Sequence, residues 1–180
     1  MIAEPGRLPA DPIPFKRIKR GTLSMPDSAV RTFTDPDAYH AAMRHAQAEG
    51  VVTARGNFRA ESTTIQLDRL SLQRSKETLP RTVYSAIDPK VFGIVFATCT
   101  DQQAYVNGHE FSRGGVIVFR AGSMGHNRSS TACQWGSIAL THQDAATAGE
   151  KIIGRELIAP QFTQRVTPPP LLLSRLLSLH

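Results

Sequence analysis

One dense run of short strand patterns, from Val51 to Leu140, constrains the fold of this chain more than any other feature. Apolar and polar residues alternate over a few positions at a time, and turn signals such as Asn107-Gly108 and Arg113-Gly114-Gly115 interrupt them. The runs Val91–Ala97 and Val116–Phe119 are continuously apolar, which indicates strands covered on both faces. Strands this short and this frequent predict a mainly β domain, a jelly roll or β-barrel, rather than helices layered on a parallel sheet.

A helix is predicted before this run. A capping side chain at position 34 or 35, with Pro36 in the first turn, starts it, and Gly50 is expected to end it. His40 and His45 fall on this predicted helix, where we expect both to face solvent. Their spacing of five matches metal ligands on one helix face poorly. The slip in the alternation at Asp68-Arg69 predicts a bulge or a tight bend in the strands that follow.

Two further helical segments are predicted after Leu140. Thr141 and Asp144 resemble a capping box that opens a short helix through Ala148, and residues 152–157 fit either a helical turn or a strand. Pro168-Pro169-Pro170 then begins a last helix. Its apolar stripe consists of Leu172, Leu173, Leu176, Leu177 and Leu179. A face this wide either packs back onto the barrel or pairs with a second protomer, and we predict that it forms the interface of a homodimer.

The composition fits one globular domain with terminal extensions. Of the 180 residues 41% are hydrophobic and 20% are charged, and the net charge is +6. The positive excess is scattered over single arginines, with one cluster, Lys16–Arg20. This cluster lies inside a Pro-rich stretch (1–30) that we interpret as an extended, solvated arm; contact with DNA or with an acidic neighbouring domain is the alternative. No apolar run is long enough to span a bilayer and no secretory signal is evident. Cys99 and Cys133 are expected to be buried thiols, so we predict a cytoplasmic location without a membrane partner.

Enzyme motifs are missing from the sequence, which contains no GxxxxGK[ST], GxGxxG, HExxH or GxSxG. Gly114, Arg120 and Gly122 occupy positions of the second metal-binding motif of cupins, but Gly125 stands where that motif has a His, and His126 is one residue off. Metal affinity requires several converging ligands, so we predict no cofactor and no catalysis. A metal-dependent cupin oxygenase or isomerase remains the alternative, and an interaction domain with a filled barrel is a third hypothesis.

Several motifs together resemble the N-terminal domain of AraC-type transcriptional regulators. In chain order they are Arg55–Glu61, Leu67–Arg74, Leu79-Pro80-Arg81, Gly108 with Glu110, Trp135-Gly136 with Leu140, Gly154–Leu157 and the Pro-led leucine helix. The resemblance covers roughly residues 33–180. It implies a cupin-like sensor domain over 31–165 and the start of a dimerisation or linker helix over 166–180. It also implies two helix-turn-helix units beyond His180, through which the whole regulator would bind DNA and control transcription.

The resemblance further implies a small-molecule effector bound in the mouth of the barrel. A pocket of this kind needs apolar walls and a few polar groups that fix orientation. The predicted ligand-binding residues are Arg59, Tyr84, His109, His126 and Trp135. The single tryptophan can wall a ligand or be plain core. Arg59 and Arg81 can hold an acidic effector, or they can pair with Glu61 and Glu77.

Overall fold

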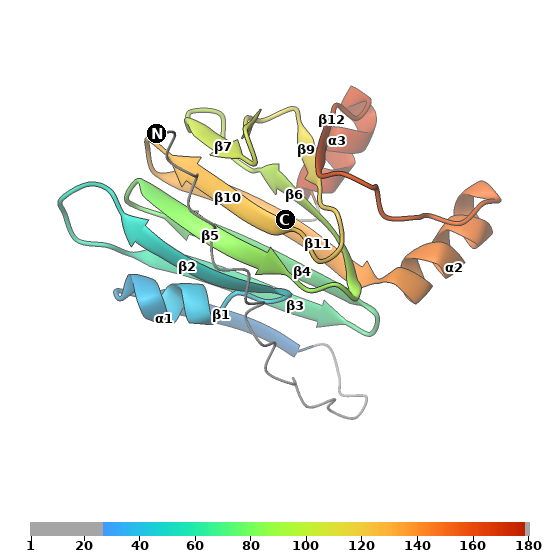
Figure 1. Cartoon of the computed structure of the whole chain (residues 1–180), viewed down its shortest axis with the longest axis horizontal. Helices are drawn as coiled ribbons and strands as arrows, with labels where there is room; N and C mark the ends of the chain where they lie inside the picture. The colour runs from blue at the N-terminus through green and yellow to red at the C-terminus, as the bar shows by residue number, and fades with distance from the viewer. Residues whose placement is uncertain (1–26, 179–180) are drawn as a thin grey trace, which may run out of the picture.

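Two antiparallel sheets make up most of the protein (Figure 1), for which a computed structural model describes residues 27–178. The seven-stranded sheet has the order β1 (Asp27–Phe33), β3 (Ala60–Leu67), β4 (Leu70–Glu77), β11 (Cys133–Thr141), β6 (Val91–Ala97), β9 (Val116–Val118) and β12 (Gln164–Val166). The five-stranded sheet has the order β2 (Ala46–Val52), β5 (Arg81–Ile87), β10 (Met124–Ser129), β7 (Ala104–Val106) and β8 (His109–Glu110). The chain crosses repeatedly between the sheets, as in a cupin-like jelly roll. The predicted mainly β fold with C-terminal helices is confirmed.

The helix before the strand run begins as predicted and ends early. α1 (Pro36–Ala41) is capped by the Asp35 carboxylate, which accepts a hydrogen bond from the Asp37 backbone N–H at 3.1 Å. The predicted end at Gly50 is wrong, because Ala46–Val52 forms strand β2 and pairs along its whole length with β5. The alanines and polar residues of this segment fit a helix as well as a strand, and pairing with a neighbouring strand decides its conformation.

Two-residue turns connect two of the strand pairs. The change of alternation at Asp68-Arg69, predicted to be a bulge or a tight bend, is a tight bend. It reverses the chain between β3 and β4. Asp68 takes a positive φ of 39° there. Asn107 and Gly108 have φ values of 49° and 80° and join β7 to β8, so the predicted hairpin is confirmed.

Two helices follow the last long strand. α2 (His142–Ile153) starts where the Thr141 hydroxyl accepts a hydrogen bond from the Asp144 N–H at 3.1 Å, and it continues past the predicted end at Ala148. α3 (Pro170–Ser178) starts within the predicted proline run, and none of its residues is buried. Leu179 of the predicted stripe and residues 1–26 of the predicted arm lie outside the described residues, whereas 27–30 belong to β1. Within residues 27–178 no helix is long and apolar enough to cross a membrane.

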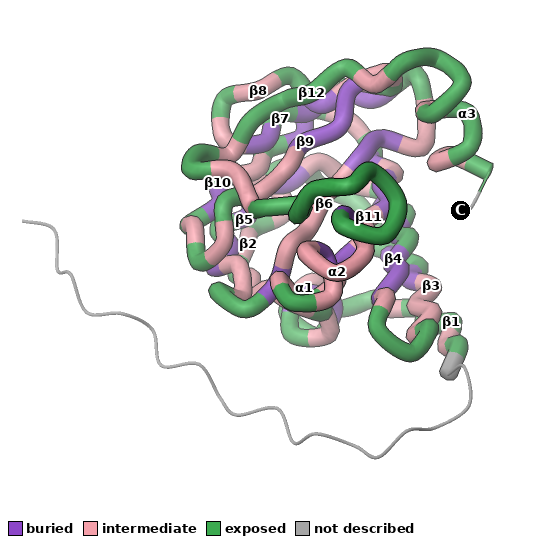
Figure 2. The backbone as a smooth tube through the Cα atoms, turned by 90° about the vertical axis from the view of Figure 1, so that its right-hand side faces the viewer, coloured by how far each residue is buried: buried purple, intermediate pink, exposed green. Residues whose placement is uncertain are grey.

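The core lies between the inner faces of the two sheets, where most of the buried positions in Figure 2 are found. One apolar cluster consists of Ala97, Ala104, Val106, Phe111, Ile117, Cys133 and Trp135. A smaller one, under α1, consists of Tyr39, Phe58 and Ala60. Buried polar side chains also point inward from the larger sheet, among them Ser62, Gln73, Ser75 and Glu77. The interior is therefore partly polar, and the candidate cavity lies next to this polar part.

Candidate ligand cavity

A single buried carboxylate joins four elements of the structure. Glu77, at the end of β4, is fully buried and forms a two-point ion pair with Arg81 at the start of β5, through the Arg81 Nε and Nη2 atoms. The Tyr39 hydroxyl from α1 donates to Glu77 Oε1 at 2.9 Å. The Trp135 indole N–H from β11 donates to the same oxygen at 2.8 Å. Both charges of the pair are therefore hydrogen-bonded, as groups removed from water must be.

The ion pair changes the protonation behaviour of its neighbours. Burial acts to lower the pKa of Arg81, but the negative charge of Glu77 outweighs it and raises the pKa above its ordinary value. Burial, together with the Glu77 charge, raises the pKa of Tyr39 well above its usual range. Burial also raises the pKa of the Cys133 thiol to about 12, so this thiol stays protonated at neutral pH. Cys99 and Cys133 are both free, and Cys133 is buried as predicted while Cys99 is half-buried.

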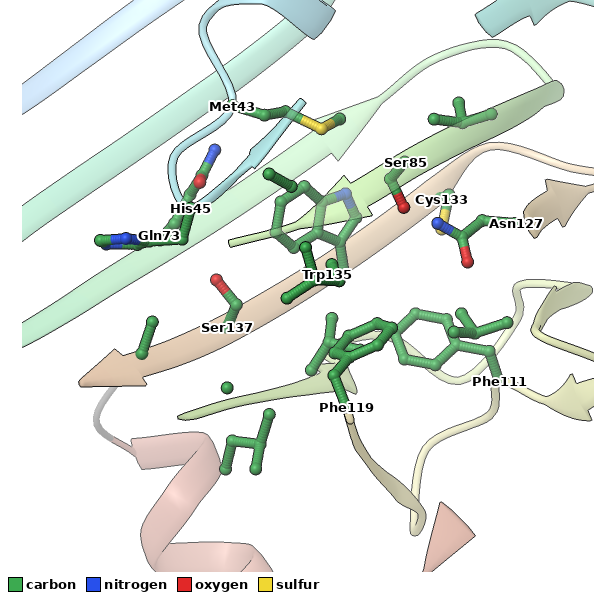
Figure 3. A pocket seen from close by; sticks show the side chains of 18 of the residues that line it. Met43, His45, Gln73, Ser85, Phe111, Phe119, Asn127, Cys133, Trp135 and Ser137 are labelled. Carbon is green, nitrogen blue, oxygen red and sulfur yellow. The ribbon is translucent and has the colours of Figure 1, made fainter. Parts of the chain in front are cut away.

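A cavity of about 140 Å³ lies between the two sheets, next to this ion pair. Most of its wall is apolar. Figure 3 shows the Trp135 indole near its middle, with Met43 to one side and Phe111 and Phe119 to the other. Because Trp135 lines the cavity and also bonds Glu77, the cavity wall is connected directly to the buried ion pair.

Three polar side chains in the cavity lining have a buried atom with no hydrogen-bond partner among the described residues. These atoms are His45 Nε2, Ser85 Oγ and Asn127 Oδ1. Ser85 and Asn127 are diagonal neighbours on the inner face of the smaller sheet, since Ser85 pairs with Gly125 and Val83 pairs with Asn127. A Cβ atom at Gly125 would lie 2.4 Å from Ser85 Oγ, so the glycine makes room for this hydroxyl. At the position of the metal-binding His of cupins this chain has Gly125, and the Ser85 hydroxyl occupies the space that a larger side chain there would need.

Of the five predicted ligand-binding residues, Trp135 is the one that lines the cavity. Tyr84 and His126 are exposed and pair on the outer face of the smaller sheet, with ring centroids 4.9 Å apart. Arg59 is exposed beside β3, and His109 is half-buried on β8. The structure thus brings Tyr84 and His126 together, but away from the cavity. Their role in ligand binding stays a prediction.

Among the cavity residues that the sequence did not reveal are the three with unpartnered polar atoms: His45, Ser85 and Asn127. The alternation of β5 carried a usable signal for one of them, since Ser85 shares its face with Val83 and Arg81. Asn127 follows a glycine-containing segment without clear alternation. His45 was hidden by its assignment to a helix. Two roles were considered for Arg81, holding an acidic effector or pairing with Glu77. The structure shows the pairing with Glu77.

The two histidines predicted to face solvent do not do so. His40 is only 3% exposed, and neither ring nitrogen has a hydrogen-bond partner in residues 27–178. His45 follows α1, is half-buried and lines the cavity. The prediction failed because the helix is short and packs its Tyr39–His40 face inward against the barrel. Burial lowers the pKa of both imidazoles, and the positive charge of Arg81 lowers that of His40 further.

We expect mild acid to destabilise the protein through His40. The unfolded chain takes up a proton near pH 6.5, whereas the folded chain resists it, so the free energy of unfolding falls as the pH drops below about 6.5, by up to about 1.4 kcal/mol per pH unit. His40→Gln should flatten this dependence. Urea unfolding followed by circular dichroism at pH 7.5 and pH 5.5 measures the difference. His126→Gln, on the surface, is the matched control, and equal slopes for His40→Gln and the unaltered protein would contradict the expectation.

Two antiparallel sheets around a cavity, followed by helices, define a cupin-like jelly-roll domain. Among solved structures the fold is similar to that of the AraC-like transcriptional activator CuxR, with a TM-score of 0.58 and 12% sequence identity over 84% of this chain and 58% of that chain. At this identity the likeness shows the fold, and it confirms the predicted resemblance to the cupin-like domain of AraC-type regulators at that level. The chain spans less than two thirds of the activator's length.

Other comparisons add little. Protein Ylba from E. coli aligns with a TM-score of 0.28 and 11% identity over 77% of this chain and 52% of that one, too low to carry an argument. No protein-family model and no curated protein matches the sequence. In the part of the chain that the structure describes, no group of three His, Cys, Asp or Glu side chains is placed to hold a metal ion.

Proposed function

We propose that this chain is the regulatory domain of an AraC-type transcription factor that acts in the cytoplasm. It binds a small effector between its sheets and dimerises through α3, and helix-turn-helix units outside this sequence contact DNA. The observation that carries the proposal is the cavity, found inside a fold shared with a transcriptional activator. The Leu-rich helix that follows the barrel supports the dimer.

The ion pair offers a route by which an occupied cavity affects the rest of the domain. A ligand that contacts Trp135 changes the position of the indole that holds Glu77, and Glu77 also holds Tyr39 of α1. An effector regulates only if it binds one arrangement of the domain better than another. Under this proposal, the two arrangements differ in how α1 and β11 meet at Glu77.

The right effector is expected to raise the melting temperature. A ligand present at 100 times its Kd adds about 2.7 kcal/mol to the free energy of unfolding, which corresponds to roughly 5–10 °C for a domain of this size. A thermal-shift screen of small metabolites measures this. Ala139→Leu is the control, because Ala139 lines the cavity and a larger side chain there fills it. A compound that shifts both proteins equally binds elsewhere, and a comprehensive library without a single hit would contradict the proposed function.

A further inference from the structure

We propose that the effector is a small, uncharged molecule about the size of a single six-membered ring that carries a hydroxyl group. The inference rests on the proposed function and narrows it to one ligand class. The volume of the cavity limits the size of the ligand, its charged groups disfavour an ion, and its unpartnered polar atoms call for a hydroxyl group.

The cavity volume limits the size of the ligand. Pockets for drug-sized molecules measure about 300–1,000 Å³, and an apolar cavity of about 150 Å³ accommodates benzene. At about 140 Å³ the cavity between the sheets matches one ring with a small substituent. Aromatic walls from Trp135, Phe111 and Phe119 suit the flat faces and edges of such a ring.

The charged groups around the cavity disfavour an ionic ligand, because no Asp or Glu of residues 27–178 lines the cavity and its arginines are already engaged or exposed. Three arginines contribute to the lining, and all three are engaged or face solvent. Arg81 donates two hydrogen bonds to the Glu77 carboxylate, from Nε and Nη2. Arg128 is exposed and lies over the Tyr105 ring, with its Cζ atom 4.8 Å from the centroid. Arg44 is exposed and donates to Gln66 Oε1 at 3.4 Å. A carboxylate brought inside would have to displace Glu77 from Arg81 or do without a free arginine as counter-charge, and a buried ion without a counter-charge costs several kcal/mol.

The polar atoms of the cavity call for a group that both donates and accepts hydrogen bonds. Ser85 is 6% exposed, and its hydroxyl has no partner among residues 27–178. Asn127 Oδ1, also buried, accepts only and lacks a donor there as well. Figure 3 shows Ser85 near the Trp135 indole and Asn127 farther along, next to Cys133. A ligand hydroxyl can donate to Asn127 and accept from Ser85, whereas a carboxylate supplies no donor.

Isothermal titration calorimetry with four probes tests the inference. Phenol has the ring and the hydroxyl, toluene lacks the hydroxyl, benzoate adds a charge, and 2-naphthol is too large. Phenol is expected to bind most tightly. Asn127→Leu keeps the number and branching of the side-chain heavy atoms and should weaken phenol roughly tenfold, the effect of one hydrogen bond, while toluene is unchanged. Met124→Leu, also on β10 but with an exposed side chain outside the cavity lining, should change neither. Ala139→Leu should abolish binding of every probe.

The outcomes separate this inference from the proposed function. Benzoate or 2-naphthol binding as tightly as phenol, in a manner lost in Ala139→Leu, overturns the ligand class and leaves the sensor role standing. The same holds if phenol does not bind but a metabolite raises the melting temperature of the unaltered protein and not of Ala139→Leu. Phenol binding that Asn127→Leu does not weaken overturns the hydroxyl contact. If neither the probes nor any metabolite binds, the proposed function itself fails.

Discussion

Replacing Glu77 with Ala is expected to lower the free energy of unfolding by about 3–5 kcal/mol. The substitution leaves the Arg81 guanidinium buried without its counter-charge, and it also removes the acceptor for the Tyr39 hydroxyl and the Trp135 indole N–H. A buried donor that loses its acceptor keeps its full desolvation penalty. Urea unfolding monitored by circular dichroism measures the loss, and a change below about 1 kcal/mol would show that water or another group replaces the carboxylate.

A double variant separates the effect of the buried charges from that of the hydrogen bonds to the carboxylate. Glu77→Leu combined with Arg81→Met removes both charges and should be markedly more stable than Glu77→Ala, because a buried ion pair replaced by apolar side chains is often neutral in stability. Asp68→Asn is the surface control. It breaks an exposed ion pair with Arg69, 3.6 Å long, and should change stability by less than about 1 kcal/mol. If the double variant is as unstable as Glu77→Ala, the hydrogen bonds of the carboxylate rather than its charge stabilise this part of the fold.

The strand run was predictable because local signals and tertiary structure agree there. The Asn107-Gly108 turn needs two positive φ values, which few residue pairs accept, so the hairpin could be located from two letters. Val91–Ala97 becomes β6 in the middle of the larger sheet, where a continuous apolar run is expected. Where a residue type is required by a turn backbone or by a position in the middle of a sheet, sequence alone suffices.

The strand formed by Ala46–Val52 could not be predicted from local sequence signals. Its first five residues have no strong preference for a strand, and the segment becomes β2 because β5 offers an unpaired edge. If this segment is assumed to be helical, His45 is predicted to face solvent, and one of the polar atoms of the cavity is missed. Ser85 and Asn127 are ordinary polar residues in sequence. Only the register of β5 against β10 places them both inside.

The leucines of α3 are exposed or half-buried, and we expect them to form the dimer interface. Leu172 is 54% exposed, Leu171 is 65% exposed, and the other leucines of this helix within the described residues are at most half-buried. The helix lies at the periphery of the domain in both overall views (Figure 1, Figure 2). A leucine side chain transferred from water to an interface contributes about 1.5–3 kcal/mol. Uncovered apolar area on this scale favours a second protomer over solvent.

Replacing Leu172, Leu173, Leu176 and Leu177 with Ser should therefore convert a dimer into a monomer. Sedimentation equilibrium is expected to report twice the chain mass of 19.7 kDa for the unaltered protein and the chain mass itself for the variant. Serine also weakens helices, so the same four positions changed to Ala give a variant that keeps helix propensity and should still be monomeric. Ile152→Ser with Ile153→Ser on α2 removes apolar side chains that are 80% and 52% exposed and should leave the dimer intact. An unchanged mass in both leucine variants would remove α3 from the interface.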